Sequence, residues 1–504
     1  MLFNSPIFIF AFVPIVFFGY FFLNAQRLWI GARLWLLAAS LLFYGYWNPL
    51  YLPLILSSIG VNYGVGIILG ILGKEREKTR QCLYTKWRRA VLWLGVLFNI
   101  ALLGYFKYVD FFIENINVFL ENKIEILNIV LPLAISFFTF QQISYIVDSY
   151  HRKTQEYNFL NYALFVTFFP QLIAGPIVHH KQMMPQFSSK WNLVKKYKNI
   201  AVGFFIFSLG LCKKVVIADA FAPWVDYGFD EAPSLGFYEA WITSLSYTFQ
   251  LYFDFSGYSD MAIGLALLFN IYLPVNFNSP YKAKNIQKVW QCWHITLVQF
   301  LRNYIYIPLG KGRSRGYRNS INIIIVFLIA GFWHGAGWLF IIWGGMHGAA
   351  LITNRAWKRL GIKIWGWISW FLTFNFINFS LVFFRANSFS DVKKILGGMV
   401  DFGGATGLSI NDIRTENLAW GGFIIDTLNE YLPTFIFVNP FACFMILFAF
   451  VLIWFPNSLE LGGYIKGKGI STTLFGQLFA SLIFVISCYI MLSSTSSVFL
   501  YFNF

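Results

Sequence analysis

Charged residues are scarce in this sequence of 504 residues. Asp, Glu, Lys and Arg together make up only 12% of it, whereas 58% of the residues are hydrophobic and 21% are aromatic. A soluble domain needs more charge than this to cover its surface. The composition therefore excludes an ordinary soluble protein and predicts one that is embedded in a membrane.

Cysteine is rare as well. The chain has five cysteines, an odd number, scattered along the sequence and mostly inside apolar runs. Their spacing matches neither a disulfide framework nor a zinc ligand set. We expect no metal site and no disulfide scaffold. Cys292 lies two residues from His294, but side chains at that spacing point to different faces of a helix, so we interpret it as packing.

The sequence also lacks the motifs of several enzyme classes. It has no serine or cysteine elbow, no metal-ligand cluster and no phosphate-binding glycine loop. The first apolar run, residues 7–23, has no basic residues before it and no small-residue cleavage site after it. We therefore expect a retained membrane span at the N-terminus rather than a signal peptide.

Long apolar runs are what the sequence has in abundance. About 20 apolar residues cross the hydrocarbon as a helix, and roughly a dozen runs of this kind can be placed along the chain. No linker, repeat or shift in composition divides the sequence. We predict an all-α polytopic membrane protein in which residues 1–504 form a single integral-membrane domain, with a core at 131–348 and further spans at 349–504.

The net charge of +16 gives the chain an orientation. Lys and Arg accumulate in cytoplasmic loops of membrane proteins, which explains the charge without a nucleic-acid partner. The acidic segment at about 385–432 is expected on the outer face, and the C-terminus also. The basic segments expected in the cytoplasm are residues 74–89, 181–198, 311–318 and 355–363.

Polar residues concentrate in three irregular regions, residues 131–187, 247–310 and 329–348. Irregular backbone at membrane depth is stable only where protein or a water-filled cavity satisfies its polar groups. Within the second region, the spacing of apolar residues predicts one amphipathic helix from Val289 to Ile307. Asp254 and Asp260 are expected to pair with Arg302 or to line a wet cavity; a proton path in a transporter is the alternative.

The six histidines fall into two groups. His151, His179 and His180 adjoin basic loop residues, and we expect them to be solvated loop side chains. His294 and His334 each follow a tryptophan in an apolar stretch. A neutral histidine in such a place can accept a proton from a hydroxyl, as a general base must. A structural histidine bonded to a backbone carbonyl is the alternative.

Three glycines surround His334, at positions 331, 335 and 337. They predict free volume in which a substrate can approach the ring. Small residues also let membrane helices touch, so helix packing is an equal alternative.

Five blocks of sequence cover most of residues 131–348. They read LPLAISFFTFQQISYIVD, FFPQLIAGPI, YFDFSGYSDMAIG, NFNSPYKAKNIQKVWQCWHITLVQFLRNYIYIPLG and GFWHGAGWLFIIWGGMHG. In these blocks the sequence resembles the membrane-bound O-acyltransferase (MBOAT) superfamily, and specifically its bacterial branch of alginate and peptidoglycan O-acetyltransferases. The chain departs from the branch at Gln291 and Cys292, where paired arginines are common, and at Asn303, where an aspartate is common.

The resemblance implies roles for individual residues. His334, in a Trp-His-Gly triplet, is implied to be the catalytic histidine, and His294 its polar partner. His347 falls on the second His-Gly of the same block and is expected to support the site. Further supporting or substrate-binding positions are Asp254, Asp260, Arg302 and Asn278.

The resemblance also implies a fold and a donor. The expected fold is a ring of roughly 11–13 transmembrane and re-entrant helices, thinned at its centre. Acetyl-CoA is the implied acyl donor, and no metal is implied. Lys311, Arg313 and Arg315 are expected to hold the donor phosphates, although placement of positive charge in the cytoplasm also explains them.

The chain ends in SSTSSVFLYFNF, similar to the aromatic tail common in this branch. We hypothesise that Tyr501 enters the outer side of the site and carries the acyl group before passing it on. An aromatic belt at the membrane interface is the alternative.

The function implied is O-acetylation of a cell-envelope glycan from the bacterial cytoplasmic (inner) membrane. Acetyl would pass to a periplasmic or secreted partner of the SGNH, esterase-like kind and then to an alginate-like exopolysaccharide or peptidoglycan. Two alternatives remain open, a D-alanyl transferase of teichoic acids and a proton-coupled transporter or flippase.

Overall fold

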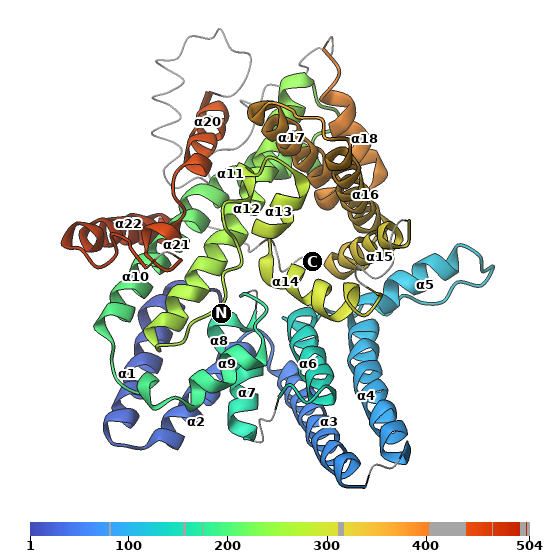
Figure 1. Cartoon of the computed structure of the whole chain (residues 1–504). Helices are drawn as coiled ribbons and strands as arrows, with labels where there is room; N and C mark the ends of the chain where they lie inside the picture. The colour runs from blue at the N-terminus through green and yellow to red at the C-terminus, as the bar shows by residue number, and fades with distance from the viewer. Residues whose placement is uncertain are drawn as a thin grey trace. The chain divides into compact units, whose positions relative to one another are not determined.

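The computed structural model describes residues 1–79, 82–154, 158–173, 175–310, 317–402, 440–465, 467–493 and 500. Within these ranges every regular element is a helix (Figure 1), which confirms the all-α prediction. The chain divides into two compact units. The first comprises Met1–Gly203 and Ala262–Val275, and the second comprises Phe204–Met261 and Asn276–Phe504.

Among the residues that the structure describes, six helical stretches are long and apolar enough to cross a membrane. Their length and hydropathy agree with a polytopic membrane protein. The six stretches are Phe8–Ala25, Pro49–Gly73, Thr85–Asn117, Tyr197–Glu231, Gly366–Arg385 and Leu474–Ser493.

In the first unit, polar contacts between buried side chains join helices that lie side by side. The Asn99 amide of α4 donates to Asn62 of α3 at 2.6 Å, and the Gln142 amide of α6 donates to Ser58 of α3 at 3.0 Å. Buried amides need such partners in an apolar interior. The elements are η1 Phe8–Phe12, α1 Val13–Ala25, α2 Trp29–Gly45, η2 Pro49–Tyr51, α3 Leu52–Thr79, α4 Cys82–Leu103, η3 Gly104–Tyr108, α5 Val109–Asn117, α6 Ile135–Tyr150, α7 Phe159–Thr167, α8 Phe169–Leu172, α9 His180–Ser188 and η4 Lys190–Asn192.

The second unit contains the two quoted sequence blocks that begin at residue 276 or later. Two helices cross the boundary between the units, α10 Tyr197–Cys212 and α12 Phe237–Leu268. The remaining elements are η5 Lys213–Ala218, α11 Asp219–Asp226, η6 Tyr227–Glu231, η7 Pro280–Lys282, α13 Ile286–Cys292, α14 Ile295–Leu301, η8 Arg302–Tyr306, α15 Tyr317–His334, α16 Trp338–Leu360, α17 Gly366–Arg385, α18 Phe389–Gly398, α20 Pro440–Trp454, α21 Ser458–Leu461 and α22 Leu474–Ser493.

Helices α15 and α16 form a close antiparallel pair, and glycine makes the approach possible. A Cβ atom at Gly331 would lie 2.2 Å from the Phe340 backbone oxygen, and one at Gly344 would lie 2.2 Å from the Phe327 backbone oxygen. At Gly335 a Cβ would meet the Phe340 ring at 2.1 Å. The expectation that Gly331 and Gly335 leave free volume beside His334 is therefore wrong, because these glycines serve helix packing.

The predicted single helix from Val289 to Ile307 is also wrong. It breaks at His294, whose φ of +42° lies in the left-handed region. Helix α13 therefore ends at Cys292 and α14 begins at Ile295. The apolar spacing continued through the break, so periodicity alone missed it. The strained conformation at His294 is the kind that persists at functional sites.

Candidate active site

His334 is the last residue of α15, and its ring is buried. The chain then reverses through Gly335 and Gly337 into α16. Aromatic rings surround the imidazole on several sides, with ring centroids 5.0 Å away at Trp333, 5.2 Å at Trp343 and 5.1 Å at Phe384. All three contacts are edge-to-face. The helix end and the packed rings hold the imidazole in one place.

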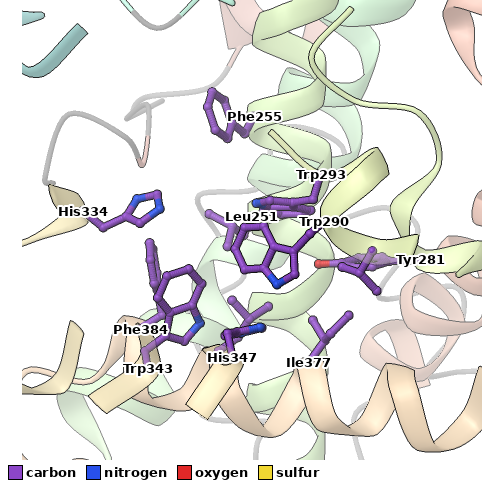
Figure 2. A pocket seen from close by; sticks show the side chains of 12 residues that line it. Leu251, Phe255, Tyr281, Trp290, Trp293, His334, Trp343, His347, Ile377 and Phe384 are labelled. Carbon is purple, nitrogen blue, oxygen red and sulfur yellow. The ribbon is translucent and has the colours of Figure 1, made fainter. Parts of the chain in front are cut away.

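The His334 ring lines a small cavity of about 30 Å³, which we call the histidine cavity (Figure 2). Its wall is aromatic and aliphatic apart from two imidazoles, the phenol of Tyr281 and the indole nitrogens. The lining residues are Leu251, Phe255, Tyr281, Val289, Trp290, Trp293, His334, Trp343, His347, Ile377, Leu381 and Phe384.

His347 lies in the same cavity, one turn along α16 from Trp343. Its ring is buried and lies 4.7 Å from Trp343 and 5.1 Å from Trp290, centroid to centroid. Its Nε2 lies 3.0 Å from the Ser380 hydroxyl on α17. The structure thus brings His347 and His334 to one cavity, although they are 13 positions apart in the sequence.

His294 is buried at the break between α13 and α14. Its Nδ1 lies 3.1 Å from Asn276 Oδ1, and that oxygen also accepts from the Thr296 amide and hydroxyl. Because the carboxamide oxygen can only accept, Nδ1 carries the imidazole proton and Nε2 holds the lone pair. Trp333 links the two sites, since its indole lies 6.1 Å from the His294 ring and 5.0 Å from the His334 ring.

Asp254 and Asp260 were expected to pair with Arg302 or to line a wet cavity. The structure instead pairs each of them with a lysine. Asp254 lies 2.9 Å from Lys214 Nζ, and Asp260 lies 2.6 Å from Lys213 Nζ. The sequence analysis missed these lysines, which follow a long apolar run. They lie on η5, which is wound so that two consecutive lysines both reach α12. Buried carboxylates require such partners, so these pairs fix α12 against η5.

Arg302 lines a second, larger cavity of about 350 Å³ together with Arg355, and we call it the arginine cavity. Trp290 belongs to both cavities. The arginine cavity is otherwise mostly apolar, with Leu297, Leu301 and Phe327 among its lining residues. It can hold a long molecule that has an apolar body and an anionic end.

Other predicted residues fall at the edge of the described chain. Lys311, Arg313, Arg315 and Tyr501 lie outside the described residues, as does most of the acidic segment at 385–432. Leu500, immediately before Tyr501, donates its backbone N–H to Asp254 Oδ2 at 3.2 Å. Asn278 accepts a hydrogen bond from the Asn457 amide at 3.0 Å and so supports a loop contact rather than lining either cavity.

The histidines assigned to loops need one correction, in the first unit. His151 is exposed as expected, but His180 is buried. Its Nε2 lies 3.6 Å from Asp148 Oδ2, and His179 Nε2 lies 2.9 Å from the same oxygen. His179 Nδ1 accepts from the Lys181 amide, so its Nε2 carries the proton that points at Asp148.

This cluster lies outside the six candidate spans. One ligand atom each from Asp148, His179 and His180 falls within 4.8 Å of the others. Burial, and then the neighbouring His179, lower the pKa of His180 to about 3, against the opposing effect of Asp148. His180 is therefore neutral at physiological pH.

Comparison with known proteins places the chain among acyltransferases. The model of the family described as membrane-bound O-acyltransferase matches residues 148–389, a range that holds His294, His334 and His347. A Helicobacter pylori protein named peptidoglycan O-acetyltransferase is 47% identical over the full chain and 98% of its own length. A Pseudomonas aeruginosa protein named probable alginate O-acetylase AlgI is 38% identical over 80% of this chain and 75% of its own. A Streptococcus thermophilus teichoic acid D-alanyltransferase is 26% identical over 50% of this chain and 68% of its own.

Proposed function

The chain belongs to the membrane-bound O-acyltransferase family and is an acyltransferase, and we propose that it transfers an acetyl group from acetyl-CoA to a hydroxyl acceptor. The observation that carries this proposal is the histidine cavity. A buried imidazole lies at the end of α15 and lines a cavity of about 30 Å³. A neutral imidazole facing so small a space suits a base that acts on a short acyl group.

The size and the lining of the histidine cavity favour acetyl over D-alanyl. One water needs roughly 10–15 Å³ of such space, so this cavity admits a group of only a few heavy atoms. A D-alanyl group would also bring an ammonium, which requires a counter-charge when it leaves water. Among the described residues that line the cavity, none is a carboxylate.

The arginine cavity suits the rest of the donor. Arg302 and Arg355 can pair with the phosphates of coenzyme A, and the apolar wall can cover its pantetheine arm. Because Trp290 lines both cavities, the thioester would lie beside this indole, with its acetyl end in the histidine cavity. Lys311, Arg313 and Arg315 stay proposed phosphate-binding residues on the strength of the sequence.

In the proposed reaction, His334 removes the proton from the acceptor hydroxyl and the oxygen attacks the thioester carbonyl. His294 acts as its polar partner through Trp333. Tyr501 is the proposed first acceptor. The hydrogen bond from the Leu500 N–H to the buried Asp254 supports this role, because it anchors the chain directly before Tyr501.

We propose that the acetyl group ends on a cell-envelope glycan, by way of a periplasmic esterase-like partner. The names of the relatives, peptidoglycan O-acetyltransferase and alginate O-acetylase, support the two candidate glycans. We place the enzyme in the bacterial inner membrane with its C-terminus outside. The Lys213 and Lys214 pairs argue against the transporter alternative, because each buried carboxylate already has a lysine partner.

The test uses the purified full chain with radiolabelled acetyl-CoA or with D-alanine loaded on its carrier protein. We expect label to reach the C-terminal peptide only from acetyl-CoA, and to reach a muropeptide or alginate oligosaccharide only when the esterase-like partner is also present. Tyr501→Phe should stop labelling of the tail peptide. Transfer of D-alanine alone, or solute flux into vesicles that survives His334→Ala, would overturn the proposal.

A further inference from the structure

The histidine cavity contains polar hydrogen atoms that the reaction described above does not use. The indole nitrogens of Trp290 and Trp343, and Nδ1 of His347, are buried and have no hydrogen-bond partner within the described part of the chain. A buried donor without a partner costs about 1–3 kcal/mol. Two indole N–H groups without a partner, beside an imidazole nitrogen that carries the proton in one of its two tautomers, therefore indicate a ligand atom at this cavity.

The three rings lie together. Ring centroids are 5.8 Å apart for Trp290 and Trp343, 5.1 Å for Trp290 and His347, and 4.7 Å for Trp343 and His347. In Figure 2 both indole nitrogens lie on the side of the cavity nearest His347, and the His334 ring lies at another side. The donors thus face the space that the acyl group would occupy, apart from the proposed base.

The Ser380 hydroxyl decides whether His347 can join the indoles as a donor. It lies 2.8 Å from the Ile377 carbonyl and 3.0 Å from His347 Nε2, and its single proton can serve only one of them. When the hydroxyl donates to Nε2, the proton of the neutral imidazole lies on Nδ1. An oxygen acceptor in the cavity favours that arrangement.

We propose that Trp290, Trp343 and His347 form the donor set that binds the acyl carbonyl oxygen and the oxyanion that develops on it. This inference rests on the proposed function and adds the residues that stabilise its transition state. Donors fixed in advance in an apolar cavity stabilise a developing negative charge strongly, because they need no reorganisation and compete with little water.

The acceptor oxygen gives its proton to His334 and forms a bond to the carbonyl carbon, and the π pair of the C=O bond moves onto the carbonyl oxygen. The two indole N–H groups and His347 Nδ1–H hold that oxyanion. When the C=O bond re-forms, the C–S bond breaks, and the leaving thiolate takes the proton from the His334 imidazolium.

The test removes one indole N–H group at a time while an aromatic side chain stays at the position. The variants are Trp290→Phe and Trp343→Phe, and also benzothienylalanine at each position, which keeps the shape of tryptophan and replaces N–H by sulfur. In each variant kcat for acetyl transfer should fall about 100-fold, as for loss of one oxyanion donor. KM for acetyl-CoA should change little, because the donor bond strengthens in the transition state.

Trp224→Phe is the matched control. Trp224 is also buried and its indole nitrogen also lacks a partner within the described residues, but it does not line the histidine cavity. The second readout is the infrared carbonyl stretch of ¹³C-acetyl-CoA bound to the His334→Gln protein. Adding Trp343→Phe or Trp290→Phe should raise that frequency, and adding Trp224→Phe should not.

Two failures are distinguishable. If the wild-type chain transfers acetyl through His334 but both tryptophan variants match Trp224→Phe in kcat and leave the carbonyl frequency unchanged, the donor set is wrong and the proposed function stands. If wild-type protein transfers no acetyl, or His334→Gln transfers it at the wild-type rate, the proposed function itself fails.

Discussion

We predict that replacing Lys214 by an uncharged residue strongly lowers the free energy of unfolding. It is almost fully buried, 2.9 Å from Asp254 Oδ1 and 2.6 Å from Asp219 Oδ1. Lys214→Met would leave Asp254 buried without its cation, and breaking a buried pair in this way costs about 3–5 kcal/mol. The double variant Lys214→Met/Asp254→Leu removes both charges, so we expect it to lose about 2 kcal/mol less than the single variant.

Thermal and denaturant unfolding in detergent measure these differences, with the exposed Lys181→Met as the control. Lys214→Met and Lys181→Met each remove one positive charge, but only Lys214→Met leaves a buried carboxylate, that of Asp254, without its cation. Lys214→Met as stable as Lys181→Met, or a double variant less stable than Lys214→Met, would refute the reasoning.

Three further predictions concern other parts of the chain. The pKa of His180 is about 3 in the folded state and about 6.5 in the unfolded state. Its contribution to stability is therefore complete above pH 6.5 and falls by about 1.4 kcal/mol per pH unit below it. Between pH 7.5 and pH 5.5, the free energy of unfolding should fall less for His180→Phe than for the wild type. Gly331→Ala should cost about 1–3 kcal/mol by overpacking, whereas Gly345→Ala, whose Cβ would meet an ordinary contact at 3.6 Å, should be near neutral in the same assay. Arg355→Gln should raise KM for acetyl-CoA about 10-fold with little change in kcat, and the exposed Lys363→Gln should not; equal KM values for the two would contradict the donor site.

The sequence predicted the all-helical membrane fold because hydropathy and helix length reflect the solvent directly. It also singled out His294, His334 and His347, because an imidazole in an apolar run is costly and visible. The structure shows all three rings buried and places two of them at one cavity.

Other features depended on contacts that are distant in sequence. Lys213 lies 47 residues before Asp260 and Lys214 lies 40 residues before Asp254, and nothing in local spacing indicated these two pairs. Ser380, which orients His347, is a common polar residue outside the quoted blocks, and Asn276, which orients His294, opens one of those blocks but was not singled out. Trp290 and Trp343 lie in apolar stretches of the sequence, so their unpaired indole nitrogens became apparent only from the packing.

The break at His294 illustrates a limit of periodicity. Apolar spacing persists on both sides of the break because α13 and α14 each bury one face, so the pattern of a single helix remains. The glycines around His334 show the converse, since one composition fits either free space or close packing and only the positions of Phe340 and Gly344 decide.

The most direct test of the central claim is the single-turnover rate of acetyl transfer from acetyl-CoA by His334→Gln in proteoliposomes. If His334 is the base, the rate should be at least about 100-fold below wild type and binding of the donor should be unchanged, because the cavity would keep its shape and lose its base. A wild-type rate in this folded variant would contradict it.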